Sequence, residues 1–435
     1  MLALAAPTPP IETRSMLVFL LQVAVLLLMA LLLGRLAVRF RMPAIVGELF
    51  AGVILGPSVF QNVAPQVAGW LFPPDPEQFH MLDAIGQFGV LLLVGVAGAH
   101  LDLRLVRRRR GAAMKIGGFG LIIPLGFGVA TGLLLPRSIF GTDVDPVVFA
   151  MFLGIAMGVS AIPVIAKTFM DMNLLHRDIS QITLTAAMLD GAFCWLLLSV
   201  ASDMATRGVR VGNLLLSLAY LAAVVLLAAV VGRPLVAKVF QLAGRSEEPT
   251  PTLMTATILI IGCAAGTHAL GLEAVVGAFI AGILISEYGK PDPARLAPLR
   301  TVVVSVLAPI FLATAGLRMD LTALTRIDVL GAALLILAIA IVGKFVGAYI
   351  GARTSRLSNW EALALGAGLN VRGAVEIIIA MVGLRLGVFN TATYTIIVLV
   401  AVVTSLMAPP ILRVAMARVE PTEEEQVRQR EHALA

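Results

Sequence analysis

Charged residues are scarce in this chain of 435 residues: only 13% are Asp, Glu, Lys or Arg, whereas 59% are hydrophobic. Soluble domains carry about 25% charged residues, and the helices of a soluble protein need a polar face. Long stretches here contain no charge at all, namely 16–34, 116–136, 211–232 and 386–412. This composition excludes a soluble all-helical protein and indicates an integral membrane protein.

Cysteine is also rare, and both copies, Cys194 and Cys263, fall within apolar stretches. Two isolated cysteines form neither a disulfide framework nor a metal-binding cluster. The sequence also lacks a phosphate-binding glycine loop, a catalytic triad and a metal cluster of His and Cys. We therefore expect neither an enzyme nor a resident cofactor.

Apolar runs of about 20 residues, the length that spans a bilayer, recur along the chain. They predict an all-α fold of about 13 transmembrane helices within a transmembrane domain at 17–415. We expect an extracellular segment, 1–16, before this domain and a short cytoplasmic tail, 416–435, after it, too small to be a nucleotide-binding regulatory domain. The predicted spans are 17–37, 44–60, 84–101, 112–135, 147–169, 179–202, 211–232, 252–270, 272–288, 301–317, 328–352, 361–384 and 391–415.

Basic residues are distributed unequally between the two sides of these spans. Of the 32 Lys and Arg residues, 23 lie on the side of the C-terminus, seven lie on the opposite side, and two lie within spans. Basic loops stay in the cytoplasm, so we expect a multi-pass protein of the cell inner (plasma) membrane with its N-terminus outside. The run Arg107–Arg110 is interpreted as a topological anchor rather than a headgroup or nucleic-acid patch, and no nucleic-acid partner is expected.

Four pairs of segments repeat in the same order. The pairs are 43–57 with 273–287, 97–103 with 315–321, 115–118 with 344–347, and 153–163 with 363–373. An odd number of spans separates the two copies, so the second copy is inverted in the membrane. The repeats extend over about 44–202 and 272–415. Inverted repeats are typical of secondary transporters, whose site lies near the midplane where the repeats meet.

Two charges deep in the spans are the leading candidates for function, because a charge at the centre of a span costs about 3 kcal/mol on insertion scales. Asp190 is central in 179–202 and has no charged neighbour in its own helix. A proton, a cation or Lys344, in 328–352, must compensate it. We therefore predict that Asp190 binds the cation and the proton and that Lys344 is its charge partner.

Other buried charges receive structural or peripheral interpretations. Arg372 and Glu376, four residues apart on one predicted helix face, are interpreted as a structural ion pair. Glu48 is a candidate for lining a cytoplasmic funnel. Glu273, at the outer end of its span, is expected to be solvated.

Two spans are predicted to be broken at the same depth. Pro163 lies in the middle of 147–169, where it removes a backbone hydrogen bond, and Ser160 precedes it. Asn370 lies among Gly368 and Gly373 and aligns with Ser160 in the repeat. Crossed broken helices expose carbonyl groups and helix ends to a cation, so Ser160 and Asn370 are predicted to help Asp190 bind it. A simple proline kink is the alternative interpretation.

These segments together resemble the monovalent cation:proton antiporter-2 family, which includes bacterial sodium/proton antiporters, Kef-type potassium systems and plant cation/proton exchangers. The resemblance covers roughly 17–415 and rests on PAIVGELFAGVILGPS (43–58), SAIPVIAK (160–167), AAMLDGAFCWLLL (186–198), GLEAVVGAFIAGILI (271–285), ATAGLRMDL (313–321), GKFVG (343–347) and LNVRGAVE (369–376). It implies a core domain that moves like an elevator against a dimerisation domain, in a homodimer. It also implies that Asp190 is the carrier and Lys344 the core lysine. Leu189 departs from relatives that carry a second polar or acidic residue there.

The sequence thus favours an antiporter that exchanges Na⁺ or K⁺ for protons, with electroneutral stoichiometry and a role in pH homeostasis. Its partners are these ions and the lipid bilayer. The alternative is a gated potassium-efflux pathway of the Kef type without its regulatory domain. Residue types alone do not select sodium or potassium.

Overall fold

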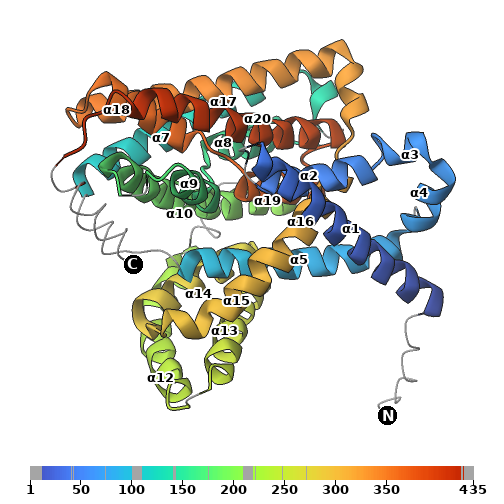
Figure 1. Cartoon of the computed structure of the whole chain (residues 1–435), viewed down its shortest axis with the longest axis horizontal. Helices are drawn as coiled ribbons and strands as arrows, with labels where there is room; N and C mark the ends of the chain where they lie inside the picture. Colours follow the sequence, from blue (N-terminus) through green and yellow to red (C-terminus); the bar gives the residue numbers. More distant parts are fainter. Residues whose placement is uncertain are drawn as a thin grey trace.

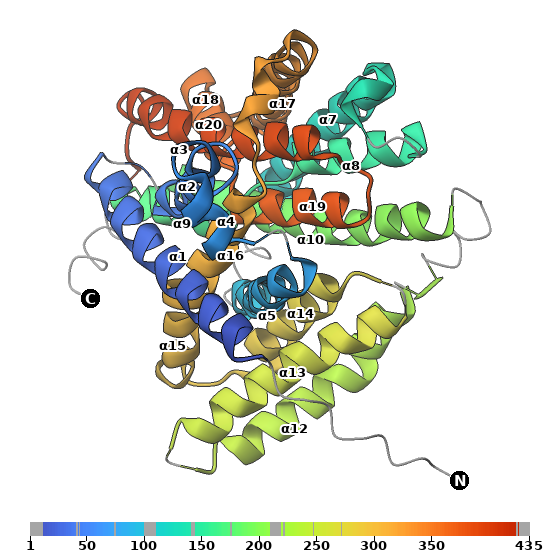
Figure 2. The same ribbon diagram turned by 90° about the vertical axis from the view of Figure 1, so that its right-hand side faces the viewer.

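The computed structural model describes residues 12–422 and residue 425, apart from 41, 43, 74, 100–109, 141–143, 175, 209–218, 221, 247 and 271. All regular elements in this described part are helical, as the composition predicts. The helices form two packed groups, seen in Figures 1 and 2, which we call the core bundle and the scaffold bundle.

The core bundle contains the helices with the deeply buried charges. Its members are α7 (Arg110–Leu134), α8 (Pro146–Gly158), α9 (Ile162–Asp171), α10 (Asp178–Arg207), α17 (Ile327–Thr354), α18 (Asn359–Leu369), α19 (Ala374–Arg385) and α20 (Thr391–Met416).

The scaffold bundle contains the remaining long helices. They are α1 (Thr13–Arg39), α2 (Ala44–Leu55), α5 (Pro76–Ala99), α12 (Arg233–Ala243), α13 (Thr250–Ala269), α14 (Ala274–Leu284), α15 (Pro293–Val302) and α16 (Ala308–Leu317). Short elements complete the described fold: α3 (Phe60–Val63), α4 (Pro65–Leu71), the 3₁₀ turns η1 (Arg137–Ile139) and η5 (Leu321–Thr325), and the π-helical turns η2 (Ala228–Gly232), η3 (Ile285–Gly289) and η4 (Val303–Leu307).

Each predicted span coincides, at least in part, with helical residues, although length alone does not establish the number 13. Ten described helical segments are long and apolar enough to cross a membrane, and α18 with α19 forms an eleventh span that is bent by 47°. The two other predicted spans correspond to the shorter apolar helices that begin at Pro146 and at Ala274. Pieces this short do not cross a bilayer alone.

Several predicted boundaries were wrong because charges ended the hydropathy windows too early. The seventh span was predicted to stop at Gly232, but the helix continues to Ala243 and includes Arg233 and Lys238. Residues 211–218 of that prediction lie outside the described part. The third and tenth spans begin earlier than predicted, at about 76 and 294. Long basic side chains allow the extension of the seventh and tenth spans, because their heads reach the interface while their stems stay in apolar surroundings.

The predicted repeat is visible in how helices approach one another. A Cβ on Gly47 of α2 would lie 2.1 Å from the carbonyl oxygen of Leu33, and one on Gly277 of α14 would lie 2.1 Å from that of Cys263. Both pairs differ by 230 residues, the offset found in the sequence. Only glycine permits such close contact, so α1 with α2 and α13 with α14 are equivalent packing units. The repeat therefore extends to α1 and α13.

The interface between the two bundles is mainly apolar. The largest buried cluster contains Leu49 and Phe311 from the scaffold bundle and Phe152 and Ile378 from the core bundle. Apolar contacts are not directional, so they do not fix one position of the core bundle relative to the scaffold bundle. The polar contacts that cross the interface therefore contribute much to that position.

Candidate cation and proton site

The site lies where two broken helices meet inside the core bundle. α8 ends at Gly158 and α9 begins at Ile162, while α18 ends at Leu369 and α19 begins at Ala374. The two breaks bond directly: Ala161 N–H donates to the Val371 carbonyl at 3.1 Å, and the Ser160 hydroxyl can donate to the Leu369 carbonyl at 2.9 Å. The structure thus contains the crossed broken helices that the repeat predicted.

Pro163 does not interrupt a helix, contrary to the prediction. The break is at 159–161, and Pro163 is the second residue of α9. The first turn of a helix needs no backbone N–H donor, so proline is favoured there. Pro163 therefore starts the second half-helix, and the extended conformation of Val159 ends the first one.

Asp190 and Lys344 form a fully buried ion pair at this crossing. Lys344 Nζ lies 2.9 Å from Asp190 Oδ2, and both side chains have no exposed surface. The same ammonium donates to Ser160 Oγ at 2.8 Å and to the carbonyl oxygens of Gly158 at 2.6 Å and Gly120 at 3.0 Å. The Gly158 carbonyl ends α8, and the partial negative charge of a helix C-terminus favours a cation.

Close packing of α17 against α7 lets Lys344 reach this position. A Cβ on Gly347 would lie 2.4 Å from the Phe119 carbonyl oxygen, so any larger residue would push the helices apart. This proximity places the Gly120 carbonyl within reach of Lys344. The small residue Gly347, near Lys344 in the sequence, therefore allows the close contact between α17 and α7 that the lysine needs.

Several polar atoms at the crossing have no hydrogen-bond partner among the described residues. They include Asp190 Oδ1 and both amide atoms of Asn370, all of which are buried. Buried polar atoms without partners cost roughly 1–3 kcal/mol each, so a ligand, a proton or water is the expected compensation.

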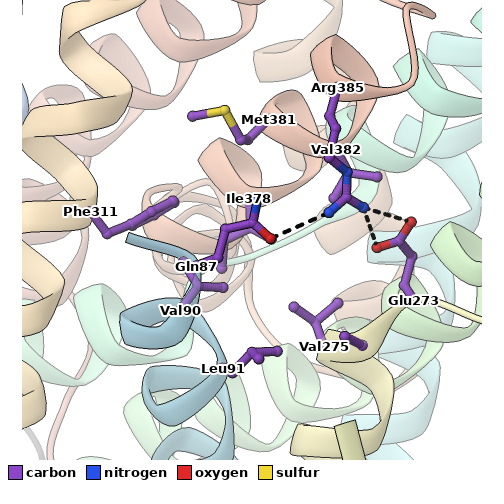
Figure 3. Close-up of a pocket in the computed structure, with 11 residues that line it drawn as sticks. Gln87, Val90, Leu91, Glu273, Val275, Phe311, Ile378, Met381, Val382 and Arg385 are labelled. Atoms are coloured by element: carbon purple, nitrogen blue, oxygen red, sulfur yellow. Dashed lines mark hydrogen bonds and ion pairs between the residues drawn. The ribbon is translucent and has the colours of Figure 1, made fainter. Parts of the chain in front are cut away.

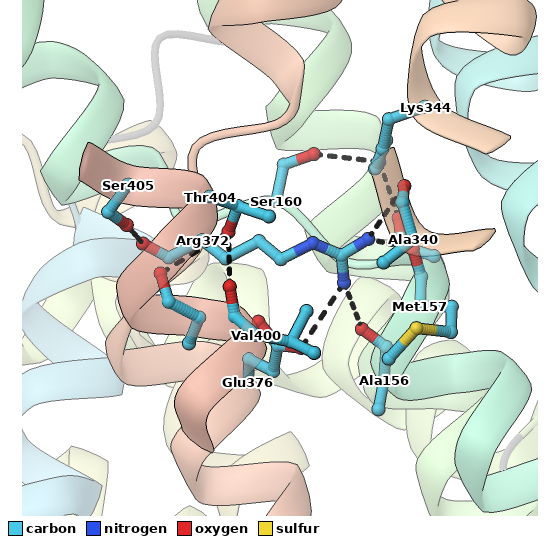
Figure 4. A network of polar contacts seen from close by, with 12 residues as sticks. Ala156, Met157, Ser160, Ala340, Lys344, Arg372, Glu376, Val400, Thr404 and Ser405 are labelled. Carbon is cyan, nitrogen blue, oxygen red and sulfur yellow. Dashed lines mark hydrogen bonds and ion pairs between the residues drawn. The ribbon is translucent and has the colours of Figure 1, made fainter. Parts of the chain in front are cut away.

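Arg372 lies in the break between α18 and α19 and not on a helix face shared with Glu376. It still pairs with Glu376, at 3.3 Å between Nη1 and Oε1, and both side chains are fully buried. Figure 4 shows its guanidinium extending across the core to the end of α8. There it donates to the carbonyls of Ala156 at 2.5 Å and Met157 at 2.7 Å. Arg372 thus connects the break between α18 and α19 to the C-terminal end of α8.

Other residues singled out from the sequence lie around the crossing. A Cβ on Gly368 would lie 2.7 Å from Thr183 Cγ2 of α10, and one on Gly373 would lie 2.8 Å from Val164 Cγ2 of α9. Both glycines therefore allow the half-helices to pack closely. Glu48 lies on α2 of the scaffold bundle with a partly buried side chain.

Glu273 is not solvated, contrary to the prediction. Its side chain is mostly buried and binds Arg385 of α19 at 2.9 Å. The sequence places Glu273 near a membrane surface but carries no signal that Arg385 is its neighbour. Glu425 of the tail was also missed: it is 2% exposed and binds Arg177, the residue before α10.

Broken helices that cross at a buried carboxylate, within an inverted repeat, define the class of secondary transporters. The family model described as "Sodium/hydrogen exchanger, transmembrane" matches residues 23–418, so this chain belongs to the sodium/hydrogen exchanger family.

Named relatives agree with this assignment. The chain is 28% identical over 403 residues to the Na⁺/H⁺ antiporter NhaS4 of Synechocystis, covering 92% of this chain and 98% of that protein. It is 27% identical to the Na⁺/H⁺-K⁺ antiporter GerN of Bacillus cereus, covering 91% and 95%. It is 26% identical to cation/H⁺ antiporter 17 of Arabidopsis thaliana, of which it spans about half. The solved structure of the sodium proton antiporter MjNhaP1 of Methanocaldococcus jannaschii shares the fold, with a TM-score of 0.63, 15% identity and coverage of 92% of this chain and 99% of that one.

Proposed function

We propose that this chain exchanges a monovalent cation, Na⁺ or K⁺, for protons, with Asp190 as the carrier of both. The observation that carries the proposal is a buried Asp190–Lys344 pair at the crossing of two helix breaks, with an unpartnered carboxylate oxygen. The named relatives are a Na⁺/H⁺ antiporter, a Na⁺/H⁺-K⁺ antiporter and a cation/H⁺ antiporter, which supports the same activity.

Charge balance explains how one carboxylate could serve both ions. Burial disfavours the ionised form of Asp190, whereas Lys344 and a bound cation favour it. A proton or a cation can therefore occupy the same acid in turn. Asp190 Oδ1 and the Asn370 amide oxygen are candidate ligands for the cation, because neither has a protein partner in the described part of the chain.

The movement proposed here is an elevator-like displacement of the core bundle against the scaffold bundle. The apolar interface between them supports this, because sliding breaks few hydrogen bonds. Coupled exchange also requires that the unloaded form crosses more slowly than either loaded form, because an unloaded crossing would let one ion move without the other. Assembly as a homodimer, placement in the plasma membrane with the N-terminus outside, and a role in pH homeostasis belong to the same proposal.

Counter-flow in sealed proteoliposomes tests the function directly. An imposed cation gradient should drive protons uphill, and the rate should be compared for Li⁺, Na⁺ and K⁺. A gated efflux pathway would dissipate a potassium gradient without moving protons uphill. Loss of the gradient without proton movement would therefore favour the Kef-type alternative.

A further inference from the structure

A small cavity of about 70 Å³ lies between the two bundles, away from the Asp190–Lys344 pair. Helices α5, α14 and α16 of the scaffold bundle line one part of it, and α19 of the core bundle lines the rest. Its lining includes Gln87, Glu273, Val275 and Arg385. The end of α19 and the start of α14 face the side that the basic-residue bias predicts to be extracellular.

An ion pair crosses the bundle interface at this cavity (Figure 3). Arg385 Nη2 lies 2.9 Å and 3.2 Å from the two carboxylate oxygens of Glu273, and Arg385 Nη1 lies 3.4 Å from Gln87 Oε1. The backbone N–H of Glu273 donates to Ser199 of α10 at 3.3 Å, which adds a second contact to the core bundle. This pair joins the start of α14 in the scaffold bundle to the end of α19 in the core bundle.

The geometry makes this pair sensitive to the position of the core bundle. Glu273 is 10% exposed at its side chain and precedes the first turn of α14, so its carboxylate has little freedom to follow a moving partner. A displacement of α19 along α14 by a few ångströms would separate atoms that are now 2.9 Å apart. Separation would leave a mostly buried carboxylate without its cation, which is unfavourable.

We propose that Glu273 and Arg385 form a latch that holds the predicted extracellular side of the bundle interface closed. Both are positioning residues, because they set the balance between access states without touching the transported ion. This inference rests on the proposed antiport function, since a latch matters only if the bundles move. Breaking it should shift the equilibrium toward the state that opens the cavity.

The test measures how accessible the cavity is, independently of transport. V275C places a thiol on α14 in the cavity lining, at a position now 5% exposed, in a chain that also carries Cys263→Ala. Labelling by a membrane-impermeant maleimide added from outside is followed by mass spectrometry. We expect R385Q or E273Q to raise the labelling rate of the V275C thiol about fivefold or more, the range of typical conformational couplings. Charge reversal, Glu273→Arg with Arg385→Glu, should restore slow labelling.

A matched control comes from Arg318 and Asp83, a partly buried ion pair whose members both belong to the scaffold bundle. R318Q breaks that pair without releasing the core bundle, so labelling should stay slow. Unchanged labelling in folded R385Q and E273Q, or an equal rise in R318Q, would overturn the latch. Because E273Q keeps the side-chain shape, it tests the proposal even if R385Q fails to fold.

Labelling also separates this proposal from the proposed function. Combining R385Q with D190N should leave the rise in labelling intact although exchange is lost. If the wild-type chain exchanges ions but labelling ignores the latch variants, the latch fails and the antiport function stands. If labelling responds but no exchange is measured under any gradient, the latch stands as a feature of a different transport activity.

Discussion

The Lys344 ammonium and the Asp190 carboxylate contact each other at 2.9 Å where neither has any exposed surface. Only Oδ2 of Asp190 takes part, whereas Oδ1 has no partner among the described residues. The single hydroxyl hydrogen of Ser160 can go either to Oδ2 at 3.0 Å or to the Leu369 carbonyl at 2.9 Å. One half of the carboxylate is therefore fixed by the protein and the other half is available to a ligand. This division suits a group that must stay in place while its cargo changes.

Asp190→Asn should abolish exchange while the protein remains folded. Asparagine keeps the volume of the side chain and can still contact Lys344 and Ser160, but it cannot alternate between a charged and a neutral form. Cation-driven proton flux in proteoliposomes is the measurement. Asp145→Asn is the control, because Asp145 caps α8 through Val147 N–H and asparagine caps a helix equally well. Flux in D190N comparable to the control would exclude Asp190 as the carrier.

Lys344→Ala should destabilise the fold more strongly than it impairs ion binding. Removing one partner of a buried ion pair typically costs about 3–5 kcal/mol, because the other charge stays buried without compensation. Lys344→Arg keeps the charge and should retain part of the stability. The double variant K344A/D190N should be more stable than K344A, since no lone carboxylate remains.

Thermal unfolding in detergent, at one pH for the wild type, K344A, K344R, D190N and K344A/D190N, measures this order. An unchanged melting temperature for K344A would show that the contact contributes nothing to stability. Additive effects of K344A and D190N would show that the two side chains are not energetically coupled.

Asn370→Ala should weaken cation binding without destabilising the protein. Both amide atoms of Asn370 are buried and unpartnered in the described structure, so the substitution breaks no hydrogen bond there and removes groups that are unfavourable when empty. A higher KM for the cation, with little change in the maximal rate, is expected if the amide contacts the bound ion. Thr404→Val is a suitable contrast, because Thr404 is equally buried but already bonds to the Val400 carbonyl at 2.7 Å. A lower melting temperature in N370A with an unchanged KM would assign Asn370 to the fold alone.

The sequence predicted the centre of the site better than its surroundings, for a physical reason. Asp190 and Lys344 stand out because a charge within an apolar span is costly and rarely accidental. Their partners are mostly backbone carbonyls, such as those of Gly158 and Gly120, which have no residue-type signal. The location of the breaks was predictable from the repeat, but the role of Pro163 required knowing which residue begins α9.

Contacts between distant helices were not predictable. Hydropathy assigns a depth to Glu273 and Arg385, and that depth suggested solvation for the glutamate. Whether the two residues face each other depends on how α14 and α19 rotate about their axes in the packed bundles. Glu425 shows the same limitation, because nothing in a short charged tail indicates that it caps the start of α10 through the Asp178 N–H.

Transport should be electroneutral, with one proton exchanged for one cation, because a single acid, Asp190, carries each ion in turn. The other fully buried ionisable side chains of the core bundle, Glu376, Lys344 and Arg372, do not change charge in this scheme. Asp190 with a proton and Asp190 with a monovalent cation then give the core bundle the same net charge. If Lys344 keeps its proton throughout, the membrane potential does no net work on the cycle. Four acceptor oxygens lie within 3.0 Å of Lys344 Nζ, enough to engage all three of its N–H groups, and this supports a permanently charged ammonium. Exchange measured in proteoliposomes with a valinomycin-set potential of either sign, at fixed pH and cation gradients, should reverse at the same ion gradients as without it. A voltage-dependent reversal point would contradict one-for-one exchange. It would indicate that Lys344 carries a second proton and releases that proton when the cation binds.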